Sequence, residues 1–220
     1  MRPTFTVLIG SIGRPSLRQS LDSIARQQRL PGDQCLVAFD AFEQTPSDLA
    51  GRVALVESYG EGFAACVYDA GYHWLGVEQI NYALRTLPIT GSHVFTIGDD
   101  DVFRPGVFEE LRTFAACDLL RPLLFRFCAP HARTPPFQRA ILPETPVLEP
   151  GKTSGCCIAL PRAFVRPMTT ERIITHDFEW MRAGLALAPA PLWLDYVAVV
   201  ARPHAGDVPD LGGHARVWAA

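Results

Sequence analysis

The segment Phe95-Thr96-Ile97-Gly98-Asp99-Asp100-Asp101-Val102-Phe103 carries the strongest structural signal in this chain. Its first residues belong to an apolar run over 93–97 that predicts a buried strand. Three consecutive aspartates follow this run directly. Because ligands of open α/β sheets bind outside the carboxyl ends of the strands, we expect a ligand site at the aspartates.

These three residues, Asp99, Asp100 and Asp101, form an acidic triplet that needs a source of positive charge, because adjacent carboxylates repel one another. A divalent cation is the simplest source, and hard oxygen ligands favour manganese or magnesium. Such ions are typically held by one or two carboxylates together with phosphate oxygens of a substrate. The alternative is a solvated acidic turn in front of a helix that Pro105 opens.

The first half of the chain alternates strand and helix patterns. The expected strands are residues 4–9, 35–39, 53–57 and 93–97. Ser16 is expected to cap a first helix, in which Leu17, Leu21 and Ile24 face inward. A second helix is expected over 76–87, and Pro105 is expected to open a third. This alternation is typical of βαβ units. It predicts an α/β fold with a mostly parallel, Rossmann-like sheet flanked by helices.

The second half of the chain is less regular. Residues 129–150 contain many prolines and few periodic apolar positions, which indicates a loop or a lid. The expected elements are strands over 119–127, 155–160 and 197–201, a helix over 176–187 capped by Thr175, and a flexible tail over 202–220.

Composition limits the classes of protein to which the chain can belong. With 220 residues, 48% of them hydrophobic, the chain can bury a substantial core, so we expect a single compact domain. A net charge of −3 disfavours nucleic acid as a partner. The six cysteines form no CxxC pair, and no apolar run approaches the roughly 20 residues of a membrane span. We therefore expect a cytoplasmic protein with reduced thiols and no stable membrane insertion.

Several motifs together resemble the GT-A fold, in particular the large inverting glycosyltransferase family two. The resemblance rests on the strand and loop over 6–15, Asp40 at the end of a strand, the segment Gln79-Ile80-Asn81-Tyr82-Ala83-Leu84, and the DxD-type motif over 95–103. It implies a nucleoside diphosphate sugar as donor. It also implies a nucleotide-sugar-binding half, residues 1–104, and an acceptor-binding half, residues 105–220.

The resemblance implies a role for each matching residue on the donor side. Asp99 would approach the ribose or the metal, and Asp101 would bind the metal that bridges the diphosphate. The residues expected to line the nucleotide site are Gly10, Ser11, Arg14, Asp40, Asn81, Asp99 and Asp100. For Asp40, an ordinary acid in the turn after a strand is the alternative.

Transfer to an acceptor hydroxyl needs a carboxylate as general base. In Thr175-His176-Asp177-Phe178-Glu179-Trp180, Asp177 matches the family's base, whereas His176 replaces its usual acidic neighbour. The alternative for Asp177 is a stabilising acid in the first turn of a helix. His204 follows the last expected strand, where GT-A enzymes often carry a metal-binding histidine. The alternative interpretation is that His204 binds no metal. The segment Thr153-Ser154-Gly155-Cys156-Cys157 resembles the one that lets the acceptor approach.

Three functions remain in competition. The first is a metal-dependent inverting glycosyltransferase with an unidentified acceptor: a glycan, a small molecule or a modified nucleobase. The second is a nucleotidyltransferase, for which the loop over 10–15 is a poor match because such enzymes carry a longer glycine-rich loop with a basic residue. The third is a non-catalytic module that binds a nucleotide or sugar.

Overall fold

The computed structural model describes residues 2–42, 44–69, 76–129, 140–169, 175–201 and 214–218. Nine strands in this part form one sheet with the order β3-β2-β1-β4-β8-β6-β9-β5, and β7 pairs with β6. Their bounds are β1 Phe5–Ser11, β2 Gln34–Asp40, β3 Phe63–Tyr68, β4 His93–Gly98, β5 Asp101–Phe103, β6 Leu123–Ala129, β7 Ala140–Leu142, β8 Ile158–Pro161 and β9 Leu192–Ala201.

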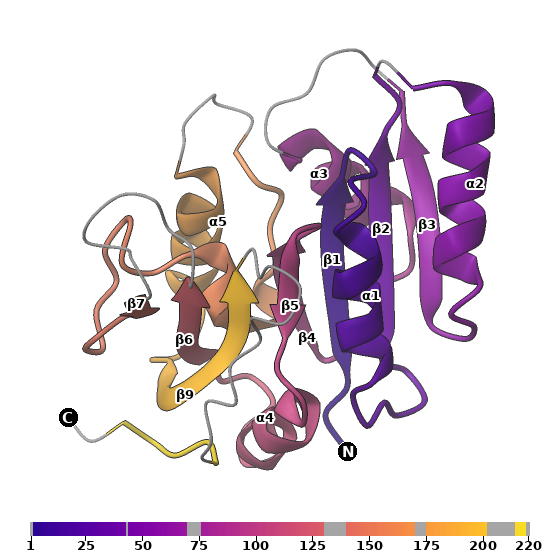
Figure 1. The fold of residues 1–220 in the computed structure, drawn as a ribbon. Coiled ribbons are helices and arrows are strands. Elements are labelled where there is room, and N and C mark those ends of the chain that lie inside the picture. The colour runs from indigo at the N-terminus through magenta and orange to yellow at the C-terminus, as the bar shows by residue number, and fades with distance from the viewer. Residues whose placement is uncertain are drawn as a thin grey trace.

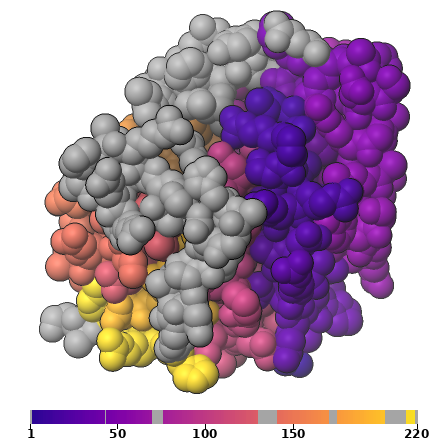
Figure 2. Space-filling model, in the orientation of Figure 1, coloured from indigo at the N-terminus to yellow at the C-terminus, as the bar shows by residue number. Residues whose placement is uncertain are grey.

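The direction of the strands changes between the two halves of the chain. Strands β1 to β4 run parallel to one another, whereas β8 joins β4 in the antiparallel direction. Strand β6 is antiparallel to β8 and parallel to β9. Both halves therefore share a sheet, and Figure 2 shows them as adjoining parts of one surface.

Helices cover both faces of this sheet (Figure 1). Their bounds are α1 Leu17–Ala25, α2 Pro46–Glu57, α3 Val77–Thr86, α4 Val107–Ala115 and α5 His176–Leu185, with short 3-10 helices at η1 Gly155–Cys157 and η2 Arg162–Phe164. The buried side chains of α1, α2 and α4 pack in one cluster, and those of α3 and α5 pack in another. The predicted α/β fold, with a mostly parallel sheet between helices, is confirmed.

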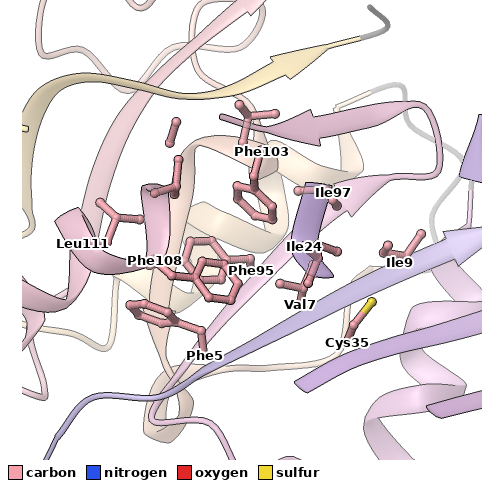
Figure 3. Packing of buried hydrophobic residues seen from close by; sticks show 14 of the residues in the cluster. Phe5, Val7, Ile9, Ile24, Cys35, Phe95, Ile97, Phe103, Phe108 and Leu111 are labelled. Atoms are coloured by element: carbon pink, nitrogen blue, oxygen red, sulfur yellow. The ribbon is translucent and has the colours of Figure 1, made fainter. Parts of the chain in front are cut away.

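Strand β1 lies at the centre of the parallel half and is buried on both faces. Phe5, Val7 and Ile9 join the cluster of α1, α2 and α4, whereas Leu8 joins that of α3 and α5. On the first face, Phe5 meets the ring of Phe95 edge to face at a centroid distance of 5.2 Å (Figure 3). A continuous apolar run is what burial on both faces of a parallel sheet requires.

The third strand was predicted at the wrong place. Residues 53–57 form the end of α2, and the third strand is β3. Leu49, Val53 and Val56 follow helical spacing and pack against the core, and Pro46 occupies the first turn of the helix. The side chain of Thr45 caps this helix by accepting the Asp48 N–H at 3.2 Å.

Other boundaries also shift. Residues 155–157 form η1 before β8 begins, and β9 begins five residues before the predicted strand over 197–201. Strand β6 begins four residues after the predicted start at 119, and α4 begins two residues after Pro105. The predicted caps are wrong, since neither Ser16 nor Thr175 makes a side-chain capping hydrogen bond.

Parts of the expected lid and tail, residues 130–139 and 202–213, lie outside the described residues, as does His204. In the described ranges, no helix combines the length and apolar character that crossing a membrane requires.

Candidate functional site

The candidate site begins where β1 and β4 end side by side. In the parallel register, Gly10 pairs with Gly98, so the residues that follow these glycines leave the sheet together. Ser11 Oγ donates a 2.7 Å hydrogen bond to Asp99 Oδ2 and accepts the Gly13 N–H at 2.8 Å. Ser11 and Asp99, two of the residues expected to line the nucleotide site, therefore lie in direct contact.

Arg14 supplies positive charge to the acidic triplet. Its Nη1 donates to Asp99 Oδ1 and to Asp100 Oδ2, both at 3.1 Å. The carboxyl group of Asp99 is buried, and this burial raises its pKa, although the Ser11 hydrogen bond and the Arg14 charge act in the opposite direction. Arg14 thus offsets part of the repulsion that the sequence predicts.

The third aspartate turns back toward β4. Asp101 Oδ2 accepts the Gly98 N–H at 2.9 Å. A Cβ atom on Gly98 would lie 2.7 Å from Asp100 Oδ1 and 3.1 Å from Asp101 Oδ2. Glycine at this position therefore allows two of the carboxylates to close over the end of the strand.

Asp40 lies at the carboxyl end of the neighbouring strand, β2. Its Oδ1 accepts the Phe42 N–H at 2.8 Å, and its Oδ2 accepts the Nε2 group of Gln79 on α3 at 2.9 Å. The buried Gln79 is a partner that sequence reasoning missed, although it lies within the segment quoted for the resemblance. These contacts fix the side chain of Asp40 at the same edge of the sheet as the triplet.

Two other predicted residues have roles in packing. A Cβ atom on Gly10 would lie 2.9 Å from the carbonyl oxygen of Gly76, so glycine lets the start of α3 approach β1 closely. Asn81 Nδ2 donates to Met168 O at 2.9 Å, and Asn81 Oδ1 accepts the Met168 N–H at 2.7 Å. Because its amide joins α3 to the segment before residue 170, we leave Asn81 out of the proposed nucleotide site.

Asp177 lies in the first turn of α5, where η1 holds its side chain. Asp177 Oδ2 accepts hydrogen bonds from Ser154 Oγ and, at 3.0 Å, from the Gly155 N–H. A Cβ atom on Gly155 would lie 2.9 Å from Asp177 Cβ, so only glycine permits this approach. Ser154 is a second partner that sequence reasoning missed, although it lies within the small-residue segment 153–157 that the sequence analysis quoted.

The same 3-10 helix connects Asp177 to the acidic triplet. Gly155 O accepts the Thr96 hydroxyl of β4 at 3.4 Å. The pKa of the Cys156 thiol is raised by its hydrogen bond with Cys157, by burial and by nearby negative charge, including that of Asp101. Helix η1 therefore contacts Asp177 of α5 through the Gly155 N–H and contacts β4 through Gly155 O.

The described residues contain no group of three or more His, Cys, Asp or Glu side chains arranged to hold a metal ion. Both oxygens of Asp99 accept hydrogen bonds from Ser11 and Arg14, so this carboxylate orders the first loop. The Asp101 carboxylate and the oxygens of a diphosphate would together form the kind of donor set that magnesium usually takes. The triplet therefore fits a cation that a substrate brings with it. His176 lies beside Asp177 at the start of α5.

Solved structures of glycosyltransferases share this architecture. S. aureus TarS 1–349 in complex with UDP-GlcNAc superposes with a TM-score of 0.66 and 16% sequence identity over 93% of this chain. The mannosyltransferase PcManGT from Pyrobaculum calidifontis, in complex with GDP-Man and Mn2+, gives 0.65 and 16% over 94%. The chain has the GT-A fold.

The likeness extends to the fold alone. This chain spans 60% of the TarS 1–349 chain, 59% of the PcManGT chain and 37% of the longer TarS chain. No family model and no curated protein sequence matches it.

Proposed function

We propose that this protein is a metal-dependent, inverting glycosyltransferase that moves a sugar from a nucleoside diphosphate sugar to an acceptor hydroxyl. The observation that carries the proposal is that Gly155 of η1 contacts both Asp177 and β4, the strand whose carboxyl end leads into the acidic triplet. The GT-A fold supports it, since TarS 1–349 and PcManGT were solved with UDP-GlcNAc and with GDP-Man.

The donor side follows from the charges at the ends of β1, β2 and β4. Arg14 is half-exposed beside the triplet and supplies a cation that a diphosphate can meet. Asp40, fixed by Gln79, supplies acceptor oxygens for N–H or O–H groups of a nucleoside. Ser11 and Asp99 order the loop that carries Arg14.

The metal would be held by Asp101 and the diphosphate. When bound, it would offset the negative charge that develops on the departing nucleoside diphosphate. His204 remains a predicted additional ligand. Ala201 pairs with Asp101 in the sheet, and His204 comes three residues after Ala201 in the sequence. His204 itself lies outside the described residues.

Asp177 is the proposed general base. Ser154 and Gly155 both donate to Oδ2, so among the described residues Oδ1 is the oxygen that an acceptor hydroxyl can approach. The acceptor hydroxyl would donate its proton to this carboxylate as its oxygen bonds to the anomeric carbon. The nucleoside diphosphate would leave from the opposite face.

The test compares sugar transfer and donor hydrolysis, with manganese present, among the native protein, Asp177→Asn and Glu179→Gln. Loss of a general base should lower kcat by about 10²- to 10⁴-fold in Asp177→Asn. Glu179→Gln is the control. Glu179 lies in the same helix and forms an exposed ion pair with Arg182, so the rate of this variant should stay near the native rate. Tight nucleotide binding without turnover, unaffected by Asp177→Asn, would instead support a binding module.

A further inference from the structure

The outer edge of β3 closes the parallel half of the sheet and has no neighbouring strand in the described residues (Figure 1). Its pairing with β2 fixes which residues face outward. The Cys35 N–H donates to Gly62 O at 2.7 Å, and the Ala41 N–H donates to Tyr68 O at 3.0 Å. In a parallel ladder, alternate residues bond to the same neighbour.

By this alternation, Ala64, Cys66 and Tyr68 direct their backbone groups toward β2, whereas Ala65 and Val67 direct theirs outward. The Phe63 N–H is already bound to Gly60 O at 3.1 Å. The outer edge therefore offers the N–H and C=O groups of Ala65 and Val67 and the C=O group of Phe63, and the described residues supply no backbone partner for these groups.

The sequence of β3 lacks common means of blocking such an edge. Phe63-Ala64-Ala65-Cys66-Val67-Tyr68 contains no proline and no charged residue. Proline and charged residues commonly protect the edge strands of soluble proteins, because an open edge is a template for another strand.

We propose that two copies of this chain pair through β3 in an antiparallel direction, with the two-fold axis between their Cys66 residues. In this register Ala65 lies opposite Val67 of the second copy, and Val67 lies opposite its Ala65. Each of these pairs exchanges two hydrogen bonds, so the N–H and C=O groups of Ala65 and Val67 in one copy all meet partners in the other. Centring the axis on Ala65 instead places Val67 opposite Phe63, whose N–H is already used.

The side chains are self-complementary in this register. Across the two-fold axis, Tyr68 lies opposite the small Ala64, and Val67 lies opposite the small Ala65. At the rim, exposed Asp69 lies opposite Phe63, and the guanidinium of Arg29 stands 4.5 Å from the centre of the Phe63 ring. The pairing thus brings a negative charge of each copy to a positive charge of the other. We infer a second copy of this chain as the partner because these matches in size and charge come from one strand facing itself.

Cys66 provides a direct test of the register. It occupies a non-hydrogen-bonded position of the new pair, where Cα atoms are about 4.5 Å apart, within the range that a disulfide spans. In a Cys117→Ser background, which removes the exposed thiol, copper-phenanthroline with oxygen should give a covalent dimer. The dimer should vanish when Cys66→Ser is added. A covalent dimer that persists without Cys66, or no covalent dimer at all, would overturn the register.

Sedimentation velocity across a range of protein concentrations tests the association itself. Native protein should dimerise. Asp69→Lys reverses one rim charge in each copy, so it should raise the dissociation constant of the dimer roughly tenfold. Glu149→Lys reverses an exposed acid in the other half of the chain and should change nothing. Val67→Pro removes an outward N–H at an edge where proline is tolerated, and it should leave a folded monomer. A native protein that stays monomeric, or equal weakening by both lysine variants, would refute the proposal.

Discussion

Replacing Ser154 by alanine tests how the proposed base is held. Ser154→Ala removes one of the two hydrogen bonds to Asp177 Oδ2 and leaves the 3.0 Å bond from the Gly155 N–H. A hydrogen bond to a charged group contributes about 1.5–3 kcal/mol. If that loss falls on the transition state, kcat should drop by about 10- to 150-fold, because each 1.36 kcal/mol is a factor of ten. KM for the donor should change little, because Ser154 acts on the acceptor side.

The assay is steady-state sugar transfer at saturating manganese and donor, together with urea unfolding to confirm that the fold is intact. Ser154→Thr keeps the hydroxyl and should recover most of the native kcat. Thr113→Ala serves as a control, since its exposed hydroxyl donates to Glu110 O in its own helix. An unchanged kcat in Ser154→Ala, or an equal loss in Ser154→Thr, would refute the reasoning that orientation of Asp177 governs the rate.

Two further predictions concern stability. Gly10→Ala should lower the free energy of unfolding by about 1–3 kcal/mol, because the new Cβ would lie 2.9 Å from the backbone oxygen of Gly76. Gly51→Ala should instead raise the free energy of unfolding by about 0.4–1 kcal/mol, because Gly51 lies in a helix with open space around the new Cβ. Urea unfolding measures both, and equal effects would contradict the close packing at Gly10. The raised pKa of Asp99 means that the folded state binds more protons than the unfolded state, so native protein should lose stability relative to Asp99→Asn as pH rises from about 3.8 through the raised pKa. A series of unfolding curves against pH measures this difference, and the opposite slope would show that burial does not dominate the environment of Asp99.

Elements with strong local patterns were predictable from the sequence. The strands around residues 4–9, 35–39 and 93–97 are apolar on both faces, and α1 carries Leu17, Leu21 and Ile24 at helical spacing. The position of β3 was not predictable in this way. Its alanines have weak strand preference, whereas the β-branched residues of α2 resemble a strand when read without their tertiary partners.

The site was predictable only where neighbouring strands determine it. Ser11 and Asp99 meet because β1 and β4 end together, although they lie 88 positions apart. The partners Gln79 and Ser154 escaped prediction because their contacts depend on how α3 and η1 pack on the sheet. The contact of the Asn81 amide with the Met168 backbone, 87 positions away, was not predictable for the same reason.

The central claim is that the acidic triplet binds a nucleoside diphosphate through a divalent cation. Calorimetric titration of UDP and GDP into the native protein, with manganese and then with a chelator, tests it most directly, alongside Asp101→Asn and the exposed control Glu109→Gln. We predict that one nucleotide binds only when manganese is present, that Asp101→Asn abolishes this binding, and that Glu109→Gln preserves it. Nucleotide affinity that is the same with and without manganese, or that survives in Asp101→Asn, would contradict the claim.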